Sequence, residues 1–431
     1  MKAIVQPGSV CGSIIVPGSK SHTIRALLIA MVSGGQSIIR NPLLSEDCKS
    51  AMRVALQFGA KCEVEDERWV VTSPENGLRT PDDVVNVGNS GTTLYFMTAV
   101  AALLEDAVVF TGDQSIRKRP SEPLLDALRQ LGATAFTTRR NSKAAPFVVK
   151  GPIRAGKVVM SGVTSQWTSA ILLASPLCDG RMRIELPEPR ETPYIEMTID
   201  WMRKCGVSLE YDEKEFKWYE VGGGQRYKPF DRYIPSDWSS VAFPAVSALG
   251  AGSKVEITNL DFADKQGDMK VIDYLISMGA DIKKDKERGT LTVTGGRPLG
   301  GTTVDMLSTP DALPIMSVAG CIAEGTTVLT NVSGTRLKET DRVAVMSEAL
   351  NKMGADITYD DNTMTIRGGK PLKGLALDSH DDHRVAMALT AAALFAEGST
   401  TIEHAECAGV TFPGFYEKLS RLGARIEMKE E

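Results

Sequence analysis

The hydrophobic and polar positions of this chain form a pattern that recurs six times. In each copy a helical pattern ends on a hydrophobic residue followed by glycine, and a short alternating run typical of a strand follows, as at 61–65, 208–211 and 356–359. A glycine just past a helix is typical of a left-handed C-terminal cap. The glycines are 59, 132, 206, 279, 354 and 423, with spacings of 73, 74, 73, 75 and 69 residues. Six copies of one supersecondary unit are predicted.

Each copy also contains a β-rich run that turns through small or acidic residues into an apolar helix. The turns are 19–21, 88–90, 164–166, 236–238, 309–311 and 381–383. The helices expected after the later turns include 94–104, 170–177, 241–249, 313–322 and 385–395. Their apolar positions extend nearly all round, so we expect buried helices with the sheets outside them.

The length of 431 residues favours two domains, with three units in each. The change of domain is expected near 233–235, after the Gly-rich stretch 221–225. Because a strand precedes the first turn, residues 1–17 should join the last three units. The sequence therefore predicts one domain over 18–234 and another over 235–431 plus 1–17, with hinges near 17–20 and 233–236.

Composition and charge narrow the range of possible functions. The chain is 42% hydrophobic and 24% charged, which is typical of a globular protein, and its net charge is −5. This charge argues against a general nucleic-acid or membrane surface, so a small anionic ligand must be drawn by local Lys and Arg. Seven Cys without a CxxC pair and four His disfavour a disulfide framework and a structural zinc. No apolar run reaches about 18 residues, so a cytoplasmic protein is expected.

The stretch Pro17-Gly-Ser-Lys-Ser-His-Thr-Ile-Arg25 reads as a strand-to-helix turn between the runs 13–16 and 26–32. The free N–H groups of such a helix start, beside Lys20 and Arg25, are suited to phosphate or carboxylate. Gly-Ser-Lys-Ser alone is also a common loop and lacks Walker A spacing. The recurrence of the turn favours an anion site.

Three further segments carry charge. The run 117–119 before Pro120 is either a solvated loop or part of a site. The segment 336–342 is expected to open the helix that runs to Met353, which would place Lys338, Glu339 and Arg342 on one face, whether as exposed ion pairs or in a site. At 381–384, cations lie at an expected helix start. The helix dipole disfavours positive charge there, so we expect an anion or a carboxylate opposite them.

The remaining histidines, at 22, 380 and 404, read as ordinary structural residues. The candidate site combines two kinds of group: acids for proton transfer, and cations for at least two anionic groups of a ligand. The acids are Asp311 and Glu339, and the cations are Lys20, Arg25, Arg119, Arg342, His383 and Arg384. No nucleophilic triad or metal quartet is visible in the sequence.

Together these motifs resemble the 5-enolpyruvylshikimate-3-phosphate synthase family of enolpyruvyl transferases over nearly the whole chain. The segments that carry the resemblance are 17–25, 88–92, 117–120, 165–166, 310–312, 338–342, 382–384 and 411–413. The resemblance implies an α/β fold: a two-domain inside-out α/β barrel of six βαβαββ units, three per domain, with buried helices and outer sheets, that closes on its substrates.

The resemblance also implies a reaction. The enolpyruvyl group of phosphoenolpyruvate would be transferred to the 5-hydroxyl of shikimate 3-phosphate with release of phosphate, a step toward chorismate and the aromatic amino acids. It implies no metal or organic cofactor, small-molecule substrates as the only partners, and a monomer.

Roles follow from the resemblance for each matching position. The residues implied for phosphoenolpyruvate are Lys20, Asn89, Gly91, Arg119, Arg342, His383 and Arg384. Those implied for shikimate 3-phosphate are Lys20, Ser21, Arg25, Thr164, Ser165, Gln166, Asp311 and Lys338. Asp311 would act as the base, and Glu339, assisted by Lys20, would transfer the proton at C3.

The chain departs from the family pattern at three places. Tyr95 stands where the family usually has Arg, Val410 where it usually has Lys, and Glu191-Thr192 where it usually has Ser followed by Lys or Arg. The lost cations leave open a paralogue acting on another cyclic alcohol. They also leave open a non-catalytic phosphometabolite-binding protein, although Asp311 and Glu339 speak against it.

The sister enzyme that acts on UDP-N-acetylglucosamine shares the fold but is not favoured. It has a Lys-Asn pair in the first turn and a reactive Cys in the second unit. Here the pair is Lys20-Ser21, and no Cys lies between Cys62 and Cys178.

Overall fold

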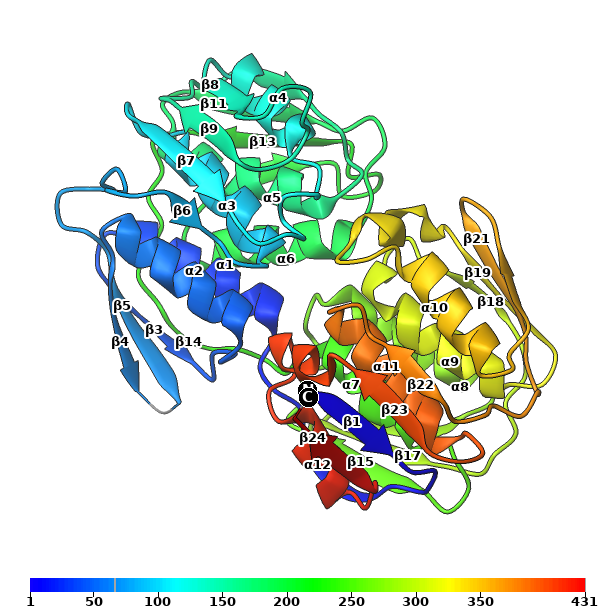
Figure 1. The fold of residues 1–431 in the computed structure, drawn as a ribbon. Helices are drawn as coiled ribbons and strands as arrows, with labels where there is room; N and C mark the ends of the chain where they lie inside the picture. Colours follow the sequence, from blue (N-terminus) through cyan, green and yellow to red (C-terminus); the bar gives the residue numbers. More distant parts are fainter. Residues whose placement is uncertain (66, 431) are drawn as a thin grey trace. The chain divides into compact units, whose positions relative to one another are not determined.

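The structure is a computed structural model, and it describes residues 1–65 and 67–430. The chain divides into two compact units, Gly18–Ile234 and Met1–Pro17 with Pro235–Glu431. We call them the 18–234 unit and the 235–431 unit. Each is built from helices surrounded by small sheets (Figure 1).

Every sheet in the described residues has four strands in the same arrangement: a parallel pair, then two antiparallel neighbours. In the 18–234 unit the orders are β14-β3-β5-β4, β6-β7-β9-β8 and β10-β11-β13-β12. The strands are β3 (Gln36–Arg40), β4 (Lys61–Glu65), β5 (Arg68–Thr72), β6 (Val85–Asn86), β7 (Ala107–Thr111), β8 (Thr134–Thr137), β9 (Phe147–Lys150), β10 (Lys157–Val159), β11 (Arg181–Glu185), β12 (Leu209–Tyr211), β13 (Trp218–Gly222) and β14 (Asp231–Tyr233).

The 235–431 unit repeats the arrangement with the orders β2-β15-β17-β16, β18-β19-β21-β20 and β22-β23-β1-β24. Its strands are β1 (Lys2–Val5), β2 (Cys11–Ile15), β15 (Lys254–Thr258), β16 (Asp281–Asp285), β17 (Thr290–Thr294), β18 (Thr303–Asp305), β19 (Thr326–Thr330), β20 (Ile357–Tyr359), β21 (Thr363–Arg367), β22 (Ala376–Asp378), β23 (Thr400–Glu403) and β24 (Ile426–Lys429). Because β1 pairs with both β23 and β24, the two ends of the chain lie in one sheet.

Two helices accompany each sheet. Those of the 18–234 unit are α1 (Lys20–Val32), α2 (Glu46–Gln57), α3 (Gly91–Ala101), α4 (Glu122–Gln130), α5 (Ser165–Ala174) and α6 (Thr192–Lys204), with a 3-10 turn η1 (Ser175–Leu177). Those of the 235–431 unit are α7 (Trp238–Ser247), α8 (Lys270–Ser277), α9 (Leu313–Ile322), α10 (Arg342–Lys352), α11 (His383–Leu394) and α12 (Phe415–Arg421), with 3-10 turns η2 (Gly267–Met269), η3 (Pro310–Ala312), η4 (Val332–Leu337) and η5 (Ala405–Val410).

The element order reads as βαβαββ six times within the described residues, from β2-α1-β3-α2-β4-β5 to β22-α11-β23-α12-β24 completed by β1. The prediction of six copies of one unit is confirmed. The first strands of the first and fourth copies are exchanged: β2 pairs in parallel with β15, and β14 pairs in parallel with β3. This exchange explains why the chain passes between the two units twice.

The six repeat glycines have the backbone that the sequence predicts. Their φ angles lie between +89° and +104°. This is the left-handed region, where a side chain would be strained and glycine is not. Each glycine ends its helix and starts the turn into the next strand.

The helices that follow the strand-to-helix turns form the core, as predicted. Every residue of α11 is buried, and α3 is buried at every position except Thr92. The strands bury alternate residues, as β3 and β15 show. A helix that is apolar on all sides must be enclosed, whereas a strand with one polar face can cover it and face water.

One predicted helix is wrong. The segment 336–353 is not a single helix, because η4 ends at Leu337, Lys338 is extended and α10 begins only at Arg342. The side chain of Asp341 accepts a hydrogen bond from the Ala344 N–H at 3.1 Å. An N-cap aspartate of this kind fixes the helix start after itself. Lys338 and Glu339 therefore lie on an irregular segment instead of a helix face.

None of the helices in residues 1–65 and 67–430 has the length and apolar character needed to cross a membrane. All seven cysteines are free thiols.

Candidate functional site

Arg342 is the centre of a buried charge cluster in the 235–431 unit. Its guanidinium bonds Asp382 at 2.8 and 3.1 Å, Asp311 at 2.8 Å and Glu339 at 2.7 Å. These bonds use four of its five N–H groups. Burial would lower the pKa of Arg342, but the three carboxylates hold its pKa well above the usual range. The cluster contains both acids that the sequence singled out.

The carboxylate of Asp311 is shared by three cations. It lies 2.8 Å from Arg342, 3.3 Å from Arg384 and 3.9 Å from Lys338. Burial would raise the pKa of Asp311, but these positive charges hold its pKa well below the usual range. Asp311 is therefore ionised and can accept a proton, although its partners make it a weak base in this state.

The sixth turn supplies the carboxylates that its cations require. Asp382 caps α11 by accepting the Arg384 N–H at 2.9 Å, and the same side chain pairs with Arg342. Arg384 reaches Asp311 with one guanidinium nitrogen, and His383 lies 4.0 Å from the carboxylate of Asp382. The predicted need for an anion or carboxylate at this helix start is met by Asp311 and Asp382.

A second group of candidate residues lies in the 18–234 unit. It is formed by the start of α3 and by the loop before α4. The guanidinium of Arg119 donates to the Asn89 side chain at 3.0 Å and to Ser115 at 3.3 Å. A Cβ at Gly91 would lie 2.7 Å from Arg119. Glycine at this position thus lets the guanidinium lie against the start of α3. Three residues implied for phosphoenolpyruvate are together here.

Lys20, the first residue of α1, pairs with Asp47 of α2 at 3.1 Å. Asp47 is buried and Lys20 is 15% exposed, so this cation is both held in place and accessible. Ser21 follows it on α1, and the Ser21 carbonyl accepts from Arg25 at 3.0 Å.

Arg25 is a buried cation with neutral partners. Its guanidinium donates to the Thr198 hydroxyl at 2.8 Å and to the Tyr194 carbonyl at 3.1 Å, both on α6, and lies over the ring of Phe96 at 5.0 Å. Burial lowers the pKa of Arg25 to about 9. Among the described residues no carboxylate pairs with it, so the site lacks a negative charge that an anionic ligand would supply.

The start of α5 is already occupied by a carboxylate. Glu191 accepts hydrogen bonds from the Ser165 N–H at 3.0 Å, from the Ser165 hydroxyl at 2.8 Å and from the Thr164 hydroxyl at 3.2 Å. Gln166 donates instead to Thr92 of α3 at 2.8 Å. The first turn of α5 thus binds a carboxylate, and a protein side chain is that anion.

Tyr95 and Val410, the two positions that lack the family's usual cations, have different local structures. Tyr95 on α3 donates its hydroxyl to the Pro120 carbonyl at 2.9 Å and packs edge-on against Trp167. It therefore joins α3 to the loop that carries Arg119. Val410 ends η5 and brings an apolar side chain to a position where the family usually has a lysine.

Sequence reasoning did not name several carboxylates that hold these residues. Asp47 pairs with Lys20, and Asp113 accepts from Asn89 at 2.7 Å. Asp382 belonged to a recognised motif, and Glu191 to a recognised departure from the family pattern, but their partners could not be read from spacing. His22 accepts from the Trp201 indole at 2.8 Å, which agrees with its prediction as a structural histidine.

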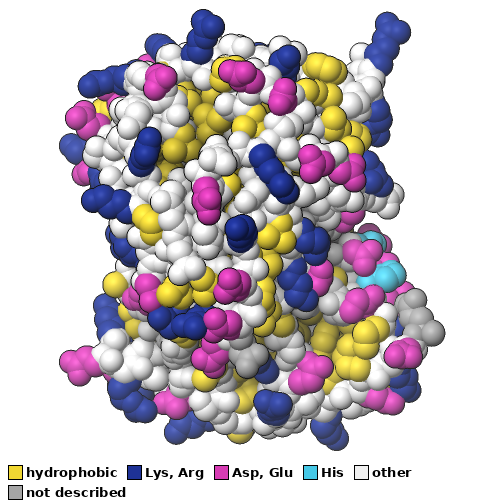
Figure 2. Space-filling view, turned by 90° about the vertical axis from the view of Figure 1, so that its left-hand side faces the viewer, with side chains coloured by type: hydrophobic (Ala, Val, Ile, Leu, Met, Phe, Trp, Pro, Cys, Tyr) yellow, Lys and Arg dark blue, Asp and Glu magenta, His cyan; other side chains and the backbone are white. Residues whose placement is uncertain are grey.

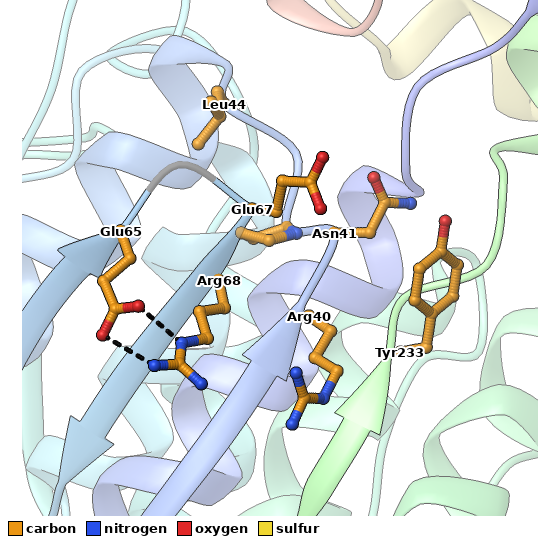
Figure 3. A pocket seen from close by; sticks show the side chains of 8 residues that line it. Arg40, Asn41, Leu44, Glu65, Glu67, Arg68 and Tyr233 are labelled. Carbon is orange, nitrogen blue, oxygen red and sulfur yellow. Dashed lines mark hydrogen bonds and ion pairs between the residues drawn. The ribbon is translucent and has the colours of Figure 1, made fainter.

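A large cavity lies elsewhere in the 18–234 unit and contains none of the predicted site residues (Figure 3). Its volume is about 1000 Å³, and its lining is Arg40, Asn41, Pro42, Leu44, Glu65, Glu67, Arg68 and Tyr233. The arginines are paired: Arg68 with Glu65 at 2.6 Å and Arg40 with Asp231 at 2.6 Å. Because its charges are balanced, this cavity is a poor match for a phosphate ligand.

Charges on the molecular surface are mixed. On the face drawn in Figure 2, lysines and arginines alternate with acidic side chains and form no large patch of one sign. This distribution agrees with a net charge of −5 and with ligand binding through local clusters.

Comparison with known proteins gives a consistent result. The family model for EPSP synthase (3-phosphoshikimate 1-carboxyvinyltransferase) matches residues 4–419. A 3-phosphoshikimate 1-carboxyvinyltransferase of Acetivibrio thermocellus is 46% identical over 426 residues, covering 99% of each chain. One of Methanosarcina acetivorans is 40% identical over 434 residues and covers both chains fully.

Solved structures agree. EPSP synthase from Acinetobacter baumannii superposes with a TM-score of 0.83 at 28% identity, covering 100% of both chains. The enolpyruvyl transferase NikO from Streptomyces tendae has a TM-score of 0.82 at 18% identity, covering 99% of this chain and 98% of that one, which shows the same fold. The two-domain inside-out α/β fold is therefore shown, and this chain belongs to the EPSP synthase family.

Proposed function

We propose that this chain is a 3-phosphoshikimate 1-carboxyvinyltransferase, which transfers the enolpyruvyl group of phosphoenolpyruvate to the 5-hydroxyl of shikimate 3-phosphate and releases phosphate. The observation that carries the proposal is the cluster of Asp311, Glu339 and Arg342, in which two acids suited to proton transfer are held by cations suited to anionic substrates. These residues lie within the segment that the family model matches, residues 4–419.

The residues proposed to hold each substrate are those that the family resemblance implies. Those for phosphoenolpyruvate are Lys20, Asn89, Gly91, Arg119, Arg342, His383 and Arg384. Those for shikimate 3-phosphate are Lys20, Ser21, Arg25, Thr164, Ser165, Gln166, Asp311 and Lys338. Arg384 supports this assignment because it gives one guanidinium nitrogen to Asp311, which leaves other donors for a ligand.

In the proposed mechanism a proton is added to C3 of phosphoenolpyruvate while the 5-hydroxyl oxygen attacks C2 and loses its proton. The tetrahedral adduct then loses phosphate from C2 and a proton from C3, which restores the enol ether. Glu339, assisted by Lys20, transfers the proton at C3, and Asp311 receives the hydroxyl proton. The cations balance the charges of the phosphates and carboxylates throughout.

The charges around Asp311 suggest how its basicity is controlled. Arg384, Lys338 and Arg342 hold its pKa low in this structure. Substrate anions that bind the same cations would offset their charge, so the pKa of Asp311 would rise when the substrates are in place. Asp311 would then be a stronger base only when there is a hydroxyl to deprotonate.

We further propose that the 18–234 and 235–431 units are the two domains of the enzyme, with hinges near 17–20 and 233–236, and that the enzyme is a cytoplasmic monomer that needs no cofactor. The free thiols of all seven cysteines are compatible with a reducing compartment. Sedimentation of the purified protein tests the monomer.

The proposed function is tested by following phosphate release with phosphoenolpyruvate and a series of acceptors. Release that requires shikimate 3-phosphate supports it. Release with a different cyclic alcohol, but not with shikimate 3-phosphate, would instead support a paralogous transferase.

A further inference from the structure

Glu191 is unusual in backbone, burial and position. It precedes α6 as its N-cap with a φ of +53°, a left-handed conformation that costs a non-glycine residue free energy. Glu191 is buried, with 5% of its surface exposed. Such a conformation persists where the surroundings fix it, and here the surroundings are the hydrogen-bond donors at the start of α5.

Those donors form an anion-binding group that we call the Ser165 cradle: the N–H and hydroxyl of Ser165 and the hydroxyl of Thr164. All three bond a single oxygen of Glu191, at 2.8 to 3.2 Å. Donors at a helix start that converge on one point favour a negative charge there. The cradle is therefore an anion site filled by the chain's own carboxylate.

A second observation indicates that an external anion belongs nearby. Arg25 bonds the backbone of Tyr194, three residues after Glu191, and its buried charge has no carboxylate partner among the described residues. Two residues at the start of α6 thus bond an occupied cradle and a buried cation without a carboxylate partner: Glu191 bonds the cradle, and Tyr194 bonds Arg25. An acceptor with two anionic groups, such as shikimate 3-phosphate, matches both.

The family usually has an uncharged serine where this chain has Glu191. A serine could share the cradle with a substrate anion, whereas a carboxylate and a substrate anion repel each other and cannot bond the same donors. We propose that Glu191 is a specificity-determining residue that competes with an anionic group of the acceptor for the Ser165 cradle, and that the acceptor binds by displacing it. The inference rests on the proposed function, because Thr164 and Ser165 are assigned there to shikimate 3-phosphate.

The test is calorimetric binding of shikimate 3-phosphate to the full chain and to three variants. Glu191→Gln keeps the shape and removes the charge, and Glu191→Gly removes the side chain and suits the left-handed backbone. Glu188→Gln is the matched control, because Glu188 is exposed on the same loop. We expect the dissociation constant to fall about tenfold in both Glu191 variants, the scale of one charged hydrogen bond, and to stay constant in the control.

Shikimate, which lacks the phosphate, identifies the competing group. If only shikimate 3-phosphate gains affinity, the phosphate displaces Glu191; if both ligands gain equally, the carboxylate does. An unchanged or larger dissociation constant for both ligands, in variants whose melting temperatures match the parent protein, overturns the inference. Should Glu191→Gly fail to fold, Glu191→Gln decides.

Phosphate release by the unmodified protein, measured on the same preparation, distinguishes a failure of the proposed function from a failure of the role of Glu191. No release with both substrates contradicts the proposed function. Release without any gain in affinity in the Glu191 variants contradicts only the role of Glu191.

Discussion

At the scale of single residues, the proposed chemistry depends most on Asp311. Asp311→Asn keeps the size of the side chain and removes the proton acceptor, so we expect kcat to fall by roughly 10² to 10⁴. Steady-state phosphate release measures this. The control is Asp361→Asn, which changes an exposed aspartate of the same unit. A kcat within a few-fold of the parent enzyme would rule out Asp311 as the base.

The buried carboxyl group of Asp268 should make the stability of the folded protein depend on pH. Burial, followed by the charge of Asp311, raises the pKa of Asp268 to about 6, although Arg384 and Ser239 act in the opposite direction. Between about pH 4 and pH 6 the folded protein thus keeps a proton that the unfolded chain loses. The free energy of unfolding must therefore fall as the pH rises through this window. At higher pH the cost of keeping Asp268 ionised in the folded protein remains.

The variant Asp268→Asn removes this penalty. We expect it to be more stable than the parent protein above pH 6, by on the order of 3 kcal/mol, and equally stable near pH 4. Melting temperatures measured from pH 4 to pH 8 give the comparison. A difference that is the same at every pH would show that the carboxyl group of Asp268 does not titrate in this range.

Tyr95 stands where the family usually has arginine, and we predict that it has a structural role there. Tyr95→Phe loses the hydrogen bond to Pro120, so the loop that carries Arg119 should be less well fixed. We expect the KM for phosphoenolpyruvate to rise roughly 2- to 10-fold, which corresponds to one hydrogen bond of about 0.5–1.5 kcal/mol. Tyr359→Phe is the control, since Tyr359 is half exposed on β20. An unchanged KM would mean that Tyr95 does not position Arg119.

At the scale of helices and strands, the repeat glycines should matter for their backbone alone. Gly132 has a φ of +94°, and no atom lies within 4 Å of the point that a Cβ would occupy, so Gly132→Ala adds strain without a clash. We expect a loss of about 1–2 kcal/mol in unfolding free energy. Gly156 also has open space but an ordinary φ, so Gly156→Ala should be neutral or slightly stabilising. Denaturant unfolding of both variants tests this, and equal effects would contradict it.

Elements with a strong periodic pattern were predictable, and those set by one side chain were not. The buried helices α9 and α11 follow from apolar residues on every face. The start of α10 does not, because Arg336 to Arg342 has a helical charge spacing, and only the capping bond of Asp341 shows where the helix begins. A local hydrogen bond can outweigh a pattern of charges.

At the scale of the whole molecule, repetition made the architecture predictable. Six similarly spaced glycines gave the number of units before any strand pairing was known. The sequence also predicted that residues 1–17 join the last three units. The partner strands of β2 and β14 could not be predicted, because they depend on pairing between residues such as Cys11 and Lys254, which are distant in the sequence.

The partners of the site residues were unpredictable for the same reason. Arg342 and Asp382 are 40 residues apart, and Arg25 and Thr198 are 173 apart. Residue types at motif positions indicate which groups act on a ligand, but which carboxylate holds which cation follows only from the fold. Glu191 is the clearest case, since its sequence position gave no sign that it fills the start of α5.

Transfer of an enolpyruvyl group to shikimate 3-phosphate can be followed by phosphorus NMR of the purified protein with both substrates. We predict that the phosphoenolpyruvate signal is converted into one equivalent of inorganic phosphate while the shikimate 3-phosphate signal is replaced by that of a new phosphate monoester. Release of phosphate with the shikimate 3-phosphate signal unchanged, or no conversion at all, would contradict it.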